Sequence, residues 1–232
     1  EQKYSTSQTS LAVYKTKQYS REETAQFAEK FFNAIGDIMD KSRTDLYDET
    51  AFYYSVEGFS LWMDYRGGTY RFVDFDTTNA DPIVKTESAA TEDEIKSVLV
   101  QYGIKLPDGV KFSNDGDGKY TFKAKKIITN GRMYDGTFSC RYYENGKMGN
   151  IQGDILRCEY DKEVSLISEQ DAFKRIEEGK FKVYSNDDKL TIKIGQVTLR
   201  YMIDTKGCYQ PIYVFDAEIN GERSEISIPA IK

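Results

Sequence analysis

The sequence predicts an α+β fold in which antiparallel sheets are each packed by an amphipathic helix, arranged in two domains. Three helix starts are marked by capping residues, and apolar residues follow them at helical spacing. The segments after each helix alternate apolar and polar residues and are joined by short glycine-containing turns. This order favours antiparallel meanders over a doubly wound parallel sheet.

The first predicted helix runs from about Arg21 to Asp40. Ser20 followed three residues later by Glu23 forms a capping box, which satisfies backbone N–H groups at the start of a helix. Apolar residues then recur with the period of one helix face: Ala28, Phe31, Phe32, Ile35, Ile38 and Met39. The sequence therefore predicts a long amphipathic helix near the N-terminus.

Two shorter helices are predicted by the same kind of signal. Thr91 with Glu94 repeats the capping box, and the apolar stripe that follows ends at Gly103. Ser168 is the predicted N-cap of the third helix, which ends at Gly179. Glycine suits these ends because it adopts the left-handed conformation without steric cost.

The strands are predicted from alternation and turn residues. Segments 51–65 and 69–75 flank Arg66-Gly67-Gly68, and segment 119–129 alternates apolar residues with lysines. A phase slip at Gly195 indicates a glycine bulge, and Asn220-Gly221 predicts a hairpin with a type I′ turn.

Two domains are expected within the 232 residues. Residues 1–18 are predicted to hold an N-terminal tether and a first strand. Residues 19–162 form the expected N-terminal α+β domain, and residues 163–232 the C-terminal one. The polar start of the chain, rich in Ser, Thr and Gln, favours a tether behind a removed export or lipid-anchor signal; a frayed terminus is the alternative.

Composition excludes several classes of partner. The formal net charge of −6 and the pI near 5.0 provide no basic surface for a phosphate backbone, so no nucleic acid is expected. No run of about 20 apolar residues is present that could span a membrane. Contact with a membrane is expected only through the removed anchor.

The common enzyme chemistries are also missing, so we expect a protein that is not an enzyme and uses no cofactor. The chain has no histidine, which excludes Ser-His-Asp and Cys-His machinery and imidazole metal sites. Neither GxxxxGK[ST] nor a GxGxxG motif after a strand occurs. No catalytic residue is therefore predicted.

Three cysteines, Cys140, Cys158 and Cys208, form no CxxC pattern, which speaks against a zinc site. A hairpin turning at Asn145-Gly146 places Cys140 opposite Ile151 and far from Cys158, so free thiols are expected. The alternative is a Cys140–Cys158 disulfide, which a turn centred on Gly149 would allow.

One group of residues on the predicted central hairpin could bind a ligand. Trp62, Tyr65 and Tyr70 lie close in sequence to the carboxylates of Asp64 and Asp74. Aromatic rings beside acids are typical of sugar binding or of a carboxylate pair in glycoside cleavage. The alternative is an ordinary aromatic sheet face with solvated acids at its edge.

Asp115 and Asp117 lie in Asn114-Asp115-Gly116-Asp117-Gly118, which resembles the start of a calcium loop. A calcium loop has a glutamate at its twelfth position, and a loop that starts at Asn114 or at Asp115 has a lysine there. We therefore expect a turn and no metal site, with these two aspartates as weak candidates for cation ligands.

The last 70 or so residues resemble a module of Gram-positive envelope proteins of the PepSY-like and YycH/YycI-type group. The resemblance lies in Ile167–Phe181, Val197–Tyr201 and Gln210–Phe215. The residues that match are Ala172, Phe173, Gly179, Tyr201, Pro211, Tyr213 and Phe215. These are core and turn positions, so the resemblance implies a fold and an extracytoplasmic regulatory role but no catalytic residues.

The expected function is therefore a non-enzymatic, extracytoplasmic binding or regulatory module, anchored as a lipoprotein. Its expected partner is a cell-envelope protein such as a sensor kinase or a peptidase. The alternative is a carbohydrate- or peptidoglycan-binding, or carbohydrate-active, protein that recognises wall glycan through the Trp62 group. A structural envelope subunit that assembles through its strand edges is a third hypothesis.

Overall fold

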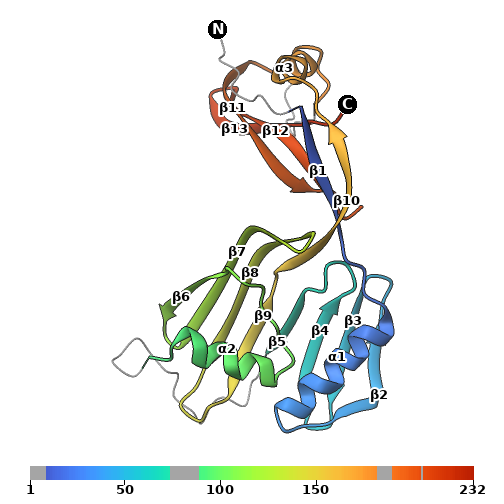
Figure 1. The fold of residues 1–232 in the computed structure, drawn as a ribbon, viewed down its shortest axis with the longest axis vertical. Helices are drawn as coiled ribbons and strands as arrows, with labels where there is room; N and C mark the ends of the chain where they lie inside the picture. The colour runs from blue at the N-terminus through green and yellow to red at the C-terminus, as the bar shows by residue number, and fades with distance from the viewer. Residues whose placement is uncertain (1–8, 74–88, 182–189, 205) are drawn as a thin grey trace. The chain divides into compact units, whose positions relative to one another are not determined.

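A computed structural model describes residues 9–73, 89–181, 190–204 and 206–232 (Figure 1). Over these residues the chain forms three helices and thirteen strands. It divides into two compact units: residues 16–159, called here the central unit, and residues 1–15 with 160–232, called the terminal unit. None of the helices in the described segments is long and apolar enough to cross a membrane.

The predicted α+β class is wrong, because the protein is predominantly antiparallel β. Strands take up 56% of the described residues and helices only 16%. The error has a local cause: helix caps are short, strong signals, whereas several strands have exposed or irregular sequences that the alternation rule does not detect. The edge strand Met39–Leu46, for example, has no buried residue.

The central unit is one antiparallel sheet with two helices. Its strands run in the spatial order β2-β3-β4-β5-β9-β8-β7-β6, and the start of β10 pairs with β8 next to β9. The bounds of its elements are α1 (Arg21–Ala34), β2 (Met39–Leu46), β3 (Thr50–Ser55), β4 (Ser60–Asp64), β5 (Tyr70–Val73), α2 (Glu92–Gln101), β6 (Lys111–Gly116), β7 (Lys119–Thr129), β8 (Arg132–Tyr142), β9 (Met148–Gly153) and β10 (Leu156–Ser165).

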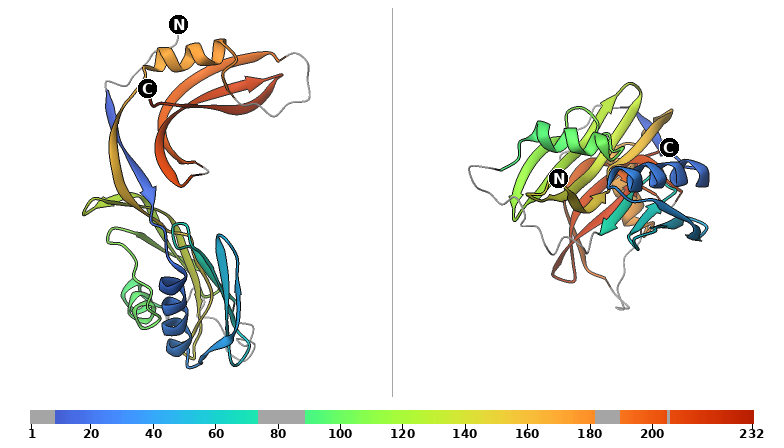
Figure 2. Two further views of the ribbon diagram at one scale, coloured as in Figure 1. Left: turned by 90° about the vertical axis from the view of Figure 1, so that its right-hand side faces the viewer. Right: turned by 90° about the horizontal axis from the view of Figure 1, so that it is seen from below.

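Both helices of the central unit lie on one face of its sheet, as Figure 2 shows. Phe31 of α1 links the layers, with its ring centroid 4.9 Å from that of Phe72 on β5 and 5.8 Å from that of Tyr102 at the end of α2. Ile95 and Leu99 bury the inner side of α2. The opposite face of this sheet carries no helix of the central unit and is called the free face below.

The predicted helix starts are confirmed. Ser20, Thr91 and Ser168 each cap a helix with a complete capping box. The first helix is shorter than predicted, because it ends at Ala34 and Gly36 then adopts φ +85°. The apolar residues at 38 and 39 therefore belong to the lead-in and start of β2.

The positions of the turns agree with the prediction more closely than the lengths of the strands do. Segment 51–65 is two strands, β3 and β4, separated by a turn in which Gly58 has φ +94°. The turn at Asn145-Gly146 is confirmed, since Tyr142 pairs with Met148 across it. The phase slip at Gly195 and the Asn220-Gly221 hairpin are also confirmed.

The terminal unit is a smaller antiparallel sheet centred on β12. Its elements are β1 (Ser10–Thr16, of which Thr16 falls in the central unit), the later part of β10, α3 (Glu169–Glu177), β11 (Ile192–Ile203), β12 (Cys208–Ile219) and β13 (Glu222–Pro229). Strand β12 pairs with β11, β13 and the end of β1. Of the predicted tether and first strand, residues 1–8 lie outside the described residues and residues 10–16 form β1.

Helix α3 packs on β12 through residues of the predicted C-terminal module. The ring centroids of Phe173 and Phe215 are 6.3 Å apart, and Ala172 is fully buried. The Tyr213 hydroxyl donates a hydrogen bond of 3.0 Å to the carbonyl of Ile167, just ahead of the helix. These contacts fix the start of α3 on the sheet.

Candidate functional site

The free face of the central sheet holds a row of side chains that crosses four strands. Phe52 on β3 is in register with Trp62 on β4, and Trp62 with Arg71 on β5. Arg71 is in turn in register with Gln152 on β9. Because side chains alternate between the two faces of a strand, these four project from the same face. We call them the Trp62 row.

The centre of the Trp62 row is an arginine stacked over an indole. The Arg71 guanidinium carbon lies 5.5 Å from the centroid of the Trp62 ring, a cation–π arrangement. Asp154 approaches the same guanidinium at 3.9 Å. The Arg71 side chain is 57% exposed and the Trp62 side chain half-buried. The row is thus accessible and has both aromatic and charged groups.

A second stacked pair, next to the Trp62 row, joins Arg43 on β2 to Tyr54 on β3. The Arg43 guanidinium carbon is 4.4 Å from the centroid of the Tyr54 ring, and Tyr54 projects from the same face of β3 as Phe52. The Tyr54 hydroxyl donates a 2.8 Å hydrogen bond to Asp45. That hydrogen bond raises the pKa of Tyr54 above its ordinary value.

The structure separates the five residues of the predicted binding group. Trp62 and Asp64 project from the free face, two positions apart on β4. Tyr65 and Tyr70 point to the helix-covered side, where Tyr65 is buried and the Tyr70 ring lies 5.2 Å from that of Phe27. Asp74 lies outside the described residues.

The carboxylate of Asp64 is engaged in a hydrogen bond within the turn that follows β4. Its Oδ1 accepts a 2.5 Å hydrogen bond from the backbone N–H of Arg66. Tyr65, by contrast, has a buried hydroxyl without a hydrogen-bond partner among the described residues.

Phe52, Arg71 and Gln152 were missed by sequence reasoning. Strand register is the signal that could have identified Phe52. Once the turn at Gly58 separates β3 from β4, Phe52 must lie opposite Trp62. Gln152 could not be found in this way, because β9 is far from β5 in sequence and no local turn fixes their register.

Asp115 and Asp117 lie in the hairpin between β6 and β7. The two carboxylate oxygens of Asp115 accept hydrogen bonds from the Ser113 hydroxyl at 2.8 Å and the Thr121 hydroxyl at 2.5 Å. Asp117 adopts φ +50° in the turn itself. In the described segments, no three His, Cys, Asp or Glu side chains gather as a possible metal site.

All three cysteines are free thiols in the structure. Cys140 and Cys158 are buried, and Cys158 is paired in register with Met133, seven positions from Cys140 along β8. Burial raises the pKa of Cys140 to about 12 and that of Cys158 to about 11. Neither is positioned as a nucleophile, because a reactive cysteine requires a stabilised thiolate.

Comparison with known proteins finds solved structures of low similarity and no matching family. No protein-family model and no curated protein matches the sequence. An uncharacterized protein from Eubacterium rectale is similar in structure, with 11% identity and a TM-score of 0.43 over 98% of this chain and 85% of that one. The Bacillus megaterium YpeB C-terminal domain is similar with 13% identity and a TM-score of 0.28, over 93% and 95% of the two chains.

No family model supports the predicted PepSY-like and YycH/YycI-type resemblance. No comparison supports the YycH/YycI part of that prediction. With TM-scores below 0.5, neither structure supports a conclusion about the fold, site or function of this chain.

Proposed function

We propose that this protein is a non-enzymatic binding module that recognises a protein partner through the free face of its central sheet. The single observation that carries the proposal is the Trp62 row, an aromatic and cationic row on a sheet face without a covering helix. Tryptophan, tyrosine and arginine are the residues that contribute most to protein–protein binding energy.

The stacking within the row supports a protein partner over a glycan. Sugars bind to tryptophan by lying flat on the ring, but Arg71 already stacks on the Trp62 ring at 5.5 Å. A glycan would have to displace this guanidinium. A protein partner can keep the stacked pair and place a carboxylate or carbonyl against its remaining N–H donors.

The cell envelope is the proposed location of that partner. The support is the resemblance of residues 167–215 to PepSY-like and YycH/YycI-type envelope proteins of Gram-positive bacteria. In this proposal the protein acts outside the cytoplasm as a regulator, with a membrane sensor kinase or peptidase as its target. The terminal unit carries the resemblance, and the central unit provides the binding face.

Affinity capture from solubilised envelope tests the proposal. The wild-type chain is compared with Trp62→Ala and Arg71→Ala, which remove the centre of the row. The matched control is Val100→Ala, since Val100 is 61% exposed on α2, on the other side of the sheet. We expect the wild type and Val100→Ala to retain a discrete membrane protein. The amount captured by each of the two row variants should be at least about tenfold lower.

Equal capture by all four proteins would contradict the proposal. If soluble wall glycan binds the wild type and is lost in Trp62→Ala, carbohydrate binding replaces it as the function. If Trp62→Ala still binds glycan, the row is not the glycan site.

A further inference from the structure

The central unit contains a cavity of about 360 Å³ on the helix-covered side of its sheet, apart from the Trp62 row. Its wall is built by Tyr19 before α1, by the Gly67-Gly68 turn between β4 and β5, and by the loop from Lys105 to Pro107 after α2. Strands β5, β8, β9 and β10 close it. The volume is in the range of small-molecule sites.

Two glycines let aromatic rings form the walls. A Cβ atom at Gly68 would come within 2.5 Å of a ring carbon of Tyr19, and a Cβ at Gly153 would overlap the ring of Tyr70. Both tyrosine rings therefore lie directly on the backbone. Phe138 continues this wall, because it shares the register of Gly153 and Tyr70.

The other side of the cavity is cationic. Arg132 and Arg157 line it, and both use one carboxylate, that of Glu159: Nε of Arg157 donates to Oε1 at 2.9 Å and Nε of Arg132 to Oε2 at 3.4 Å. Lys105 lines it too and forms no ion pair with any residue that the structure describes. Arg132 and Arg157 thus share one carboxylate and Lys105 adds a third positive charge, which leaves an excess of positive charge among these lining residues.

Glu159 holds the two arginines at the wall of the cavity. Burial tends to raise the pKa of Glu159. The hydrogen bond from Arg157 and the charge of Arg132 outweigh burial and hold this pKa below its usual value. Glu159 therefore stays charged and keeps both guanidinium groups in place. Burial raises the pKa of Tyr70, and its hydroxyl, like that of any protonated tyrosine, can donate a hydrogen bond.

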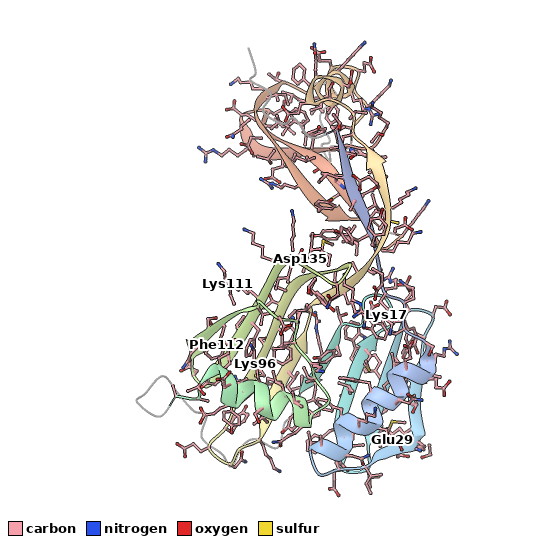
Figure 3. The ribbon with its side chains drawn as sticks, in the orientation of Figure 1. Lys17, Glu29, Lys96, Lys111, Phe112 and Asp135 are labelled. Atoms are coloured by element: carbon pink, nitrogen blue, oxygen red, sulfur yellow. The ribbon has the colours of Figure 1, made fainter. Side chains whose placement is uncertain are left out.

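Lys17, labelled in Figure 3, supports the aromatic wall from the chain segment before α1. Its Nζ lies 4.1 Å from the centroid of the Tyr19 ring and 2.8 Å from Glu23. The ring of Tyr19 is therefore held by both the glycine turn and the lysine. A wall fixed in this way is preorganised for a flat ligand.

We propose that this cavity binds a small carboxylate with an aromatic or aliphatic body. The carboxylate lies against Arg132, Arg157 and Lys105, and the body lies between the rings of Tyr19 and Tyr70. Arginine pairs with carboxylates through parallel N–H donors, and the aromatic walls bury the apolar part. Binding here is independent of the Trp62 row.

Isothermal titration calorimetry of the full 232-residue chain tests this, with phenylacetate as the probe and phenylacetamide as its uncharged isostere. We expect phenylacetate to bind and phenylacetamide to bind at least about tenfold more weakly, since a charge-assisted hydrogen bond is lost. Arg157→Gln and Lys105→Gln should each weaken phenylacetate binding, the former by about tenfold or more.

The matched control is Arg200→Gln in the terminal unit, which removes an arginine paired with Glu225 at 3.0 Å. It should leave binding unchanged. Lys105 is exposed, so its variant reports on the cavity even if Arg157→Gln fails to fold.

Several outcomes would overturn the proposal. One is equal binding of phenylacetate and phenylacetamide. Another is unchanged phenylacetate affinity in folded Arg157→Gln and Lys105→Gln. The third is the absence of binding by phenylacetate, indole-3-acetate and hexanoate at about 10 mM, a concentration that detects even millimolar affinity.

Discussion

Arg71 lies over the Trp62 ring, with its guanidinium carbon 5.5 Å from the ring centroid. An exposed cation–π pair contributes about 0.5–1 kcal/mol, so the guanidinium covers the ring without being fixed there. Phe52 lies opposite Trp62 on the neighbouring strand, where aromatic cross-strand pairs are favourable. The ring is therefore held in place by β3 and covered by β5.

Replacement of Arg71 by alanine should expose the Trp62 ring to water. Trp62 is the only tryptophan in the chain, so its fluorescence reports on this position alone. We expect a shift of the emission maximum to longer wavelength and faster quenching by acrylamide. Arg43→Ala, which removes the equivalent stack on Tyr54, is the control and should leave the spectrum unchanged. An unchanged spectrum in Arg71→Ala would show that the stack does not shield the ring.

The cysteines differ in reactivity because they differ in burial. Cys140 and Cys158 are buried with a raised pKa, of about 12 and about 11, and stay protonated at neutral pH, whereas Cys208 is partly exposed. Titration with Ellman's reagent at neutral pH should therefore modify one thiol in the folded chain and three after unfolding in guanidinium chloride. Two or three rapidly reacting thiols in the folded chain would contradict this burial pattern.

At the scale of elements, the sequence correctly predicts helix starts and tight turns, which depend on interactions between residues close in sequence. The two predicted capping boxes, the Ser168 N-cap and the Asn-Gly turns are correct, because each depends on residues within four positions of one another. Strand β2 was not predicted, and its first two residues, Met39 and Asp40, were assigned to the end of the first helix. It pairs on one edge only and its residues are exposed or half-buried, so it has no apolar alternation to detect.

The candidate site was predicted only in part for the same reason. Trp62 and Asp64 share a face because they are two positions apart on one strand. Tyr70 lies after a turn, and its pairing with Met63 sends it to the helix-covered side. Where a strand pairs with one distant in sequence, as β5 does with β9, only the folded sheet brings residues such as Arg71 and Gln152 together.

The capping carboxylates also give the helices a pH dependence. The backbone N–H of Thr91 donates to Glu94 at 2.6 Å and its hydroxyl at 2.9 Å, and these hydrogen bonds lower the pKa of Glu94. A lowered pKa in the folded state stabilises the protein above the ordinary glutamate pKa, and that contribution is lost as the pH falls through the lowered value.

Glu94→Gln should therefore reduce the loss of unfolding free energy between pH 6 and about pH 3, measured by urea denaturation. Glu57→Gln is the control, because Glu57 makes no hydrogen bond or ion pair with the residues that the structure describes and should leave the profile unchanged. A Glu94→Gln profile equal to that of the wild type would contradict the contribution assigned to this cap.

At the scale of the whole molecule, each unit has a core of its own. The core of the central unit draws only on residues between 25 and 155. The core of the terminal unit joins Val13 of β1 to residues after 163. The terminal unit therefore depends on two parts of the chain that are far apart in sequence, whereas the central unit is continuous.

Expression of separate segments tests this division. Residues 16–159 should fold alone and unfold cooperatively, as followed by Trp62 fluorescence and circular dichroism. Residues 160–232 alone lack β1, which contributes the buried Val13 and the carbonyl of Ala12 that accepts a 2.7 Å hydrogen bond from Tyr201. We expect this segment to be markedly less stable than the same unit in the whole chain. Failure of 16–159 to fold would refute an independent central unit.

The most direct test of the central claim, that the free face is the surface that binds a protein, is site-specific photo-crosslinking. A photoreactive phenylalanine derivative at position 152 replaces Gln152 in the Trp62 row, and the same residue at position 100 replaces the exposed Val100 on α2. Each 232-residue variant is irradiated in the presence of envelope membranes. We predict one discrete crosslinked membrane protein from position 152 and none from position 100. The same product from position 100 alone, or none from position 152, would contradict the claim.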